Sequence, residues 1–117
     1  MYAPHVRLGN LCALVDYNRL QLDAGVDELT DLEPLADKWR AFKWNTIEVD
    51  GHNYEQLLGA FARAAEVQDR PTVIVAATVK GKGVSYMENQ LKYHGSVPDK
   101  PELIEQAHRE IEEGVTR

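Results

Sequence analysis

Apolar runs separated by polar turns divide this chain into alternating predicted strands and helices. Residues 10–16 form an almost continuous apolar run, which is typical of a strand buried on both faces. Residues 46–49 and 72–79 contain many β-branched side chains and predict two further strands. Apolar residues at helical spacing follow each strand. This alternation predicts an α/β fold, with helices flanking a parallel sheet and right-handed crossovers.

The three predicted helices carry start signals. Pro34 suits the first turn of one helix, and Pro101 stands early in the last helix, which begins after Asp99. Asn53, with Gln56 three residues later, predicts a capped start for the middle helix. The apolar residues at helical spacing are Leu35, Trp39 and Phe42, then Tyr54, Leu57, Leu58, Phe61, Ala62 and Ala65, then Leu103, Ile104, Ala107 and Ile111, of which the last four are expected to be buried.

Polar residues follow every predicted strand, at 16–18, 50–52 and 78–82. The carboxyl ends of parallel strands meet at one edge of a sheet, and ligands gather beyond that edge. Residues 17–33 and 80–100 are expected to be loops, the first acidic and the second rich in glycine and proline. A ligand site is therefore expected where these loops leave the sheet.

Asn18 offers a neutral amide oxygen, and the backbone carbonyl of Leu20 could point the same way. Magnesium takes six oxygen ligands in a tight octahedron, so both groups suit it. On spacing alone, the more ordinary interpretation is that Asp16 and Asn18 are turn formers after a strand.

Two glycine-containing loops hold further candidates. Residues 80–83, Lys-Gly-Lys-Gly, could bring backbone amides and charge to an anion, although a solvated turn is the commoner use of such a pattern. His52 and His94 also lie beside glycine in predicted loops. Loop histidines usually lie at the surface, but an imidazole can donate to phosphate or carry protons near neutral pH.

Composition narrows the possibilities. A chain of 117 residues with 44% hydrophobic residues is of single-domain size. Its net charge of −6 argues against nucleic acid or an anionic membrane as a partner. No apolar run reaches membrane length and no signal peptide is recognisable, so a cytoplasmic location is expected. The one cysteine, Cys12, stands in an apolar stretch and is expected to be buried.

Several short motifs stand in an order that resembles transketolases. They are Leu8-Gly9-Asn10-Leu11, Val15-Asp16-Tyr17-Asn18-Arg19-Leu20-Gln21, Trp39-Arg40-Ala41-Phe42 with Trp44, Glu48-Val49-Asp50-Gly51-His52, Pro71-Thr72-Val73-Ile74-Val75-Ala76, Thr78-Val79-Lys80-Gly81-Lys82-Gly83-Val84-Ser85, Met87-Glu88-Asn89 and Tyr93-His94-Gly95. The similarity covers residues 2–112. It is strongest to the carboxyl-terminal part of the amino-terminal, thiamine diphosphate-binding subunit of transketolases that are split over two chains.

The resemblance implies a partial transketolase-like thiamine diphosphate-binding domain over residues 1–117. In such a domain Asn18 and the Leu20 carbonyl would hold magnesium, Leu22 would lie near the cofactor's rings, and His94 would face the diphosphate and the donor sugar as a catalytic residue. The implied reaction moves a two-carbon ketol unit between sugar phosphates, as in the pentose phosphate pathway. A carboxyl-terminal subunit or pyrimidine-binding domain would be the partner in an oligomer and would supply the activating glutamate.

This chain also departs from the transketolase pattern. It contains no Gly-Asp-Gly, the family's upstream carboxylate motif, so the isolated chain is expected to be inactive. Lys43 stands where relatives usually have glycine, and Asp23-Ala24 replaces the usual Asp-Gly. A non-catalytic assembly module remains an alternative. A part of another thiamine diphosphate enzyme, such as a deoxyxylulose-phosphate synthase or a ketoacid dehydrogenase subunit, is a further alternative. The sequence around Asn18 favours transketolase.

Overall fold

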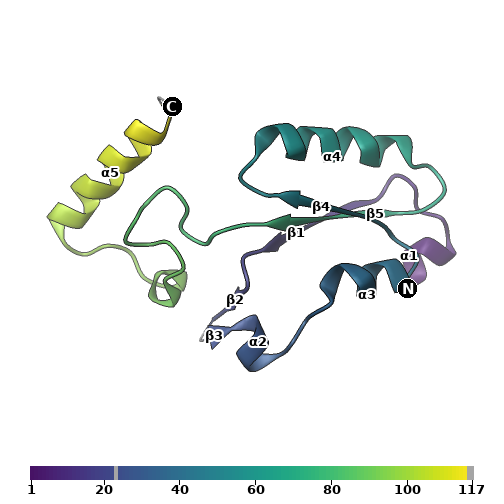
Figure 1. The fold of residues 1–117 in the computed structure, drawn as a ribbon, viewed down its shortest axis with the longest axis horizontal. Coiled ribbons are helices and arrows are strands. Elements are labelled where there is room, and N and C mark those ends of the chain that lie inside the picture. Colours follow the sequence, from purple (N-terminus) through teal and green to yellow (C-terminus); the bar gives the residue numbers. More distant parts are fainter. Residues whose placement is uncertain (23, 116–117) are drawn as a thin grey trace. The chain divides into compact units, whose positions relative to one another are not determined.

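The computed structural model describes residues 1–22 and 24–115, and these fall into two compact units (Figure 1). The first unit combines Met1–Asn18 with Asp31–Thr78. The second combines Arg19–Thr30 with the chain from Val79 onward. None of the helices in the described part of the chain has the length and apolar character needed to span a membrane.

A three-stranded parallel sheet forms the centre of the first unit. Its strands are β1 (Cys12–Tyr17), β4 (Asn45–Asp50) and β5 (Thr72–Ala77), in the order β1-β5-β4. Cys12 and Asn45 both align with Thr72, so the strands start level and their carboxyl ends meet at one edge. The predicted α/β class with a parallel sheet is confirmed. The central strand β5 is buried over almost its whole length, because a neighbour pairs with it on each side.

Two helices pack on opposite sides of β4 in the first unit (Figure 1). One is α4 (Tyr54–Glu66), whose start is capped as predicted, with the Gln56 N–H donating to the Asn53 side chain at 3.0 Å. Its inner side forms a core with β4 and β5, made of Leu57, Ala60, Ile47, Val49, Ile74 and Ala76. The other is α3 (Leu35–Ala41), on the side where Glu48 points. A short helix, α1 (Tyr2–His5), precedes the sheet.

The end of α3 has the form of a Schellman motif. The Trp44 N–H donates to the Trp39 carbonyl at 3.2 Å, and the Lys43 N–H donates to the Arg40 carbonyl at 2.8 Å. Lys43 has a φ of 68°, the left-handed conformation for which glycine is favoured. The rings of Trp39 and Trp44 meet edge to face at 4.9 Å and provide the apolar contact that accompanies this motif. The departure noted at Lys43 therefore falls at a left-handed helix end, where a lysine stands in the conformation that favours glycine.

The expectation that the first strand is buried on both faces was wrong. Exposure alternates along β1, and Cys12, Leu14 and Asp16 all point to an exposed face. Leu14 is 55% exposed. The reason is that β1 lies at the sheet edge, while α3 and α4 pack mainly on β4. Cys12 is consequently exposed rather than buried, although partial desolvation still raises the pKa of its thiol.

Part of the apolar surface on the helices is also uncovered. In α4, Tyr54 is 82% and Leu58 69% exposed, because the sheet contacts only the side that carries Leu57 and Ala60. The predicted burial in the last helix holds for Ala107 but is wrong for Ile104 and Ile111, of which Ile111 is 51% exposed. The apolar surface of each helix is thus wider than the part that neighbouring elements contact.

The second unit combines several short elements with a long last helix. A two-residue pairing joins β2 (Leu20–Gln21) to β3 (Ala24–Gly25), and α2 (Val26–Leu29) follows directly, all within the segment expected to be a loop. The glycine-rich segment is irregular, as predicted, apart from the 3-10 helix η1 (Leu91–His94). The last helix, α5 (Pro101–Val115), begins at the predicted proline.

Candidate functional site

Polar residues from all three strands meet at the carboxyl edge of the sheet. The Thr78 hydroxyl, just after β5, donates a hydrogen bond to Asp16 in β1. The Gly51 N–H, just after β4, donates to the Ala77 carbonyl at 2.7 Å. The His52 N–H turns back to the Asp50 carboxylate at 2.9 Å. The residues predicted to follow the strands therefore share one edge, as the parallel topology requires.

Glycine is required at position 51 for this close meeting. A Cβ there would lie 2.4 Å from the Thr78 Cγ2 atom and 3.0 Å from the Ala77 carbonyl oxygen. Any side chain would push the end of β4 away from β5. The Asp50-Gly51-His52 turn thus keeps the end of β4 close to the end of β5.

Asn18 follows β1 directly and is half-buried at the end of the first unit. Arg19, with a φ of 60°, turns the chain in the left-handed conformation, and its carbonyl accepts the Val26 N–H at 2.9 Å. Leu20 is half-buried in β2 of the second unit, and Leu22 is 63% exposed. Asp23, part of the noted departure from the family pattern, lies outside the described residues.

The donor groups of Asn18 and Leu20 suit magnesium in kind, since both are neutral oxygens. The two residues belong to different units, Asn18 to the first and Leu20 to the second. Within residues 1–22 and 24–115, no group of three or more His, Cys, Asp or Glu side chains is placed to hold a metal ion.

His94 ends η1 in the second unit, with its side chain exposed. The preceding residue, Tyr93, packs its ring against Tyr86 at 5.7 Å, and the Tyr86 hydroxyl donates to the Leu103 carbonyl of α5 at 2.8 Å. These contacts link the segment before His94 to the last helix. The structure places His94 on a supported turn with its imidazole accessible.

The Lys-Gly-Lys-Gly loop at 80–83 folds back on a carboxylate of its own unit. Glu88 accepts the Gly83 N–H at 3.3 Å and lies 3.5 Å from the Lys82 ammonium. Gly81, with a φ of 74°, could not carry a side chain, because a Cβ would lie 2.5 Å from the Met87 carbonyl oxygen. This is a closed turn whose charge is partly balanced internally, in line with the commoner interpretation of the pattern.

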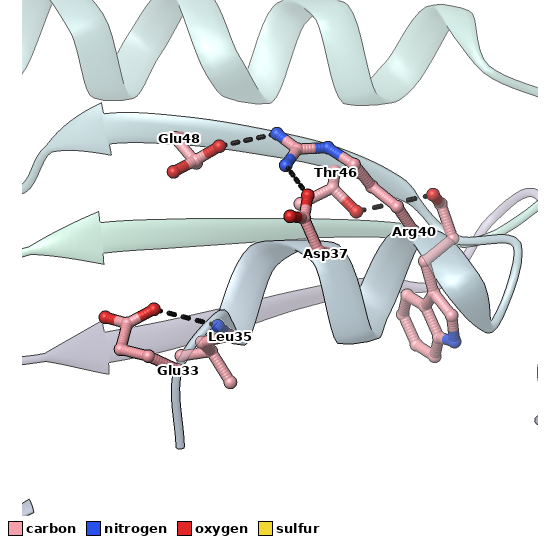
Figure 2. Close-up of polar contacts among 7 residues, drawn as sticks. Glu33, Leu35, Asp37, Arg40, Thr46 and Glu48 are labelled. Atoms are coloured by element: carbon pink, nitrogen blue, oxygen red, sulfur yellow. Dashed lines mark hydrogen bonds and ion pairs between the residues drawn. The ribbon is translucent and has the colours of Figure 1, made fainter. Parts of the chain in front are cut away.

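Sequence reasoning missed the side chains that fix the end of β1. The Tyr17 hydroxyl donates to Glu33 at 2.7 Å. The other oxygen of Glu33 accepts the Leu35 N–H at the start of α3 (Figure 2). Arg40 of α3 pairs in turn with Asp37 and, on β4, with Glu48 (Figure 2). The only signal in the sequence was an acidic residue before a predicted helix start, which does not identify a distant partner.

The fold is that of an α/β domain, and its candidate site lies at the carboxyl ends of the parallel strands. The family model described as "Transketolase, thiamine diphosphate binding domain" matches residues 1–112, and the chain belongs to this family. The transketolase resemblance seen in the ordered motifs is thereby confirmed.

Two curated relatives are themselves subunits. The chain is 44% identical over 94 residues to the 6-deoxy-6-sulfo-D-fructose transketolase subunit SqwG of Clostridium sp. (strain MSTE9), covering 80% of this chain and 34% of that protein. It is 38% identical over 111 residues to an apulose-4-phosphate transketolase subunit of Phocaeicola vulgatus, covering 95% of this chain and 39% of that protein. The chain thus spans between a third and two fifths of these relatives.

Among solved structures, the transketolase of Campylobacter jejuni superposes with a TM-score of 0.85. The match covers 95% of this chain and 17% of that one, at 24% sequence identity. At this identity the comparison supports the fold alone, and that fold is the transketolase fold predicted from the motifs.

Proposed function

We propose that this chain forms part of a transketolase that transfers a two-carbon ketol unit between sugar phosphates. The observation that carries the proposal is the family match over residues 1–112 together with two relatives named as transketolase subunits. The sheet edge around Asp16 and Asn18 supports it, since the donors there suit the magnesium ion that accompanies a diphosphate.

Each candidate residue has a distinct task under this proposal. Asn18 and the Leu20 carbonyl hold magnesium, and the apolar, exposed Leu22 packs against the cofactor's rings. His94 donates hydrogen bonds to the diphosphate and to the donor sugar. When bound, thiamine diphosphate supplies the nucleophilic carbon for ketol transfer, and the protein's contribution is to bind and orient it.

The proposal requires further protein. The sequence contains no Gly-Asp-Gly, so under this proposal a carboxylate ligand comes from another segment that bears this motif. A carboxyl-terminal subunit, or a pyrimidine-binding domain, contributes the glutamate that activates the cofactor. This arrangement implies an oligomer, and we place it in the cytoplasm.

One alternative to this proposal is a non-catalytic assembly module that kept the fold and lost the cofactor. Activity separates the two. The test combines this chain with a Gly-Asp-Gly-bearing segment and a partner subunit, then measures ketol transfer between sugar phosphates. Activity is expected from the complete assembly and not from the chain alone. A folded assembly without activity would favour the module.

His94→Ala is the matched site variant. In a dry cleft crowded with phosphate oxygens, loss of one placed donor typically lowers the rate about 100-fold to 1,000-fold. His108→Ala is the control, because His108 is exposed on α5 outside the proposed site. Near-wild-type rates for both variants would mean that His94 has no such role and that Tyr93-His94-Gly95 is only a turn.

A further inference from the structure

The end of β1, one residue before Asn18, is held on both faces of the sheet. Neighbouring residues in a strand point to opposite faces, so Asp16 and Tyr17 reach different partners. Asp16 accepts the Thr78 hydroxyl, and the Tyr17 hydroxyl donates to Glu33 at 2.7 Å. The Thr78 N–H also donates to the Tyr17 carbonyl at 3.2 Å, which extends the ladder to the last residue of β1.

Glu33 is itself fixed in place. Its second carboxylate oxygen accepts the Leu35 N–H at 2.9 Å, and its own N–H donates to Asp31 at 2.9 Å. The Lys38 ammonium donates to the Leu32 carbonyl at 2.9 Å, which closes the segment before α3 onto that helix. Glu33 therefore connects the start of α3 to the end of β1.

Helix α3 is anchored to the sheet at a separate point. Arg40 binds Asp37 in its own helix and Glu48 in β4, and Figure 2 shows this pairing beside the contact between Glu33 and Leu35. Arg40 thus holds α3 to β4, and Glu33, just before α3, binds the Tyr17 side chain of β1. Strands β4 and β1 are the two edge strands of this sheet. All of these residues belong to the first unit.

We propose that Glu33, acting through Tyr17, is a positioning residue for the magnesium ligand Asn18. The inference deepens the proposed function and rests on it. Asn18 is bonded directly to Tyr17, so its Cα lies only about 3.8 Å from that of Tyr17. Magnesium demands near-ideal octahedral geometry. A strand end that is free to swing would therefore weaken metal binding even with the Asn18 amide intact.

The chemistry of the contact suits this task. A hydroxyl that donates to an ionised carboxylate makes a short, charge-assisted hydrogen bond, roughly twice as strong as a neutral one. Loss of the partners of metal ligands typically weakens metal affinity about 10-fold to 100-fold. Because Tyr17 acts through the backbone and the contact is exposed, we expect a smaller effect, roughly threefold to tenfold.

The first experiment uses the 117-residue chain alone and measures amide hydrogen exchange. Tyr17→Phe should speed exchange in residues 17–22 and 31–35 while the rest of the sheet stays protected. Tyr86→Phe is the matched control, since it removes a tyrosine hydrogen bond of similar length, 2.8 Å, in the other unit. Unchanged exchange around Asn18 in Tyr17→Phe would overturn the proposal, whatever the chain's function.

The second experiment measures the magnesium concentration that half-saturates cofactor binding in the complete assembly. Tyr17→Phe should raise it roughly threefold to tenfold, with binding recovered at high magnesium. Glu33→Ala should act similarly, Glu33→Gln less, and adding Tyr17→Phe to Glu33→Ala should change little more. His108→Ala, exposed on α5 outside the proposed site, should leave this concentration unchanged.

These outcomes separate the positioning role of Glu33 from the proposed function of the chain. A lower melting temperature in Tyr17→Phe without a change in magnesium dependence would mean that the contact is only structural, which refutes the positioning role. If the wild-type assembly binds no cofactor, the proposed function fails and the metal role of Glu33 fails with it. The exchange experiment would still report whether Glu33 holds the end of β1.

Discussion

Replacing Lys43 by glycine should stabilise the chain. Lys43 occupies the position after the α3 cap with a φ of 68°, and the two hydrogen bonds of the Schellman motif hold it there. A residue with a Cβ in this conformation costs about 1–2 kcal/mol. Glycine relieves that strain, but its greater conformational freedom in the unfolded chain destabilises the folded state by roughly 0.5–1 kcal/mol. The net gain expected for Lys43→Gly is about 0.5–1 kcal/mol.

Urea unfolding followed by tryptophan fluorescence is a suitable assay. The chain has two tryptophans, Trp39 and Trp44, and both belong to this helix end, where their rings lie 4.9 Å apart. A gain of this size should move the urea midpoint upward without changing the slope of the transition. In a thermal melt it corresponds to roughly 2–6 °C.

Two variants separate strain from other effects. Lys43→Ala removes the charge but keeps the Cβ, so it should bring no comparable gain. Ala36→Gly, inside α3, should destabilise by about 1 kcal/mol, because there glycine relieves nothing. If Lys43→Gly proves no more stable than Lys43→Ala, the reasoning from the left-handed conformation is refuted.

Three further predictions concern the isolated chain. It should not bind thiamine diphosphate with magnesium at useful affinity, because it lacks the Gly-Asp-Gly carboxylate motif, and micromolar binding by calorimetry would contradict this. It should self-associate in light scattering, because Leu14 and Leu58 are more than half exposed; Leu58→Glu should reduce the association, whereas a stable wild-type monomer would argue against it. Hydrogen bonds from Gln106 and Ser85 lower the pKa of Glu110, so their stabilisation is full above about pH 4.5 and is lost as the pH falls through the lowered pKa. In Glu110→Gln the denaturant midpoint should therefore fall less as the pH is lowered, and a pH profile unchanged from that of the wild type would count against the contact.

The elements of the fold were predictable because their signals are local. The cap at Asn53 needs only Gln56 three residues away, and the β-branched run of β5 indicates a strand in any context. What covers each face was not predictable. Leu14 and Tyr54 are apolar and stand at the right spacing, but burial depends on which elements pack against them. An apolar pattern indicates which face of an element tends to be buried, but it does not identify the element that packs against that face.

The candidate site divides in the same way. The motif around Asn18 and the meeting of polar residues at one sheet edge follow from local sequence and parallel topology. The contacts that fix this edge do not, since Asp16 and Thr78 are 62 residues apart and Tyr17 and Glu33 are 16 apart. Such pairs can be predicted only once the strand order and the helix placement are known, because no local pattern selects one acidic residue among several.

The most direct test of the central claim is a calorimetric titration of thiamine diphosphate into the complete assembly, with and without magnesium. If the chain is part of a transketolase cofactor site, binding should require magnesium and weaken strongly in Asn18→Ala, while His108→Ala binds as the wild type does. A folded assembly that binds no cofactor, or binds it equally without magnesium and with Asn18→Ala, would contradict the account.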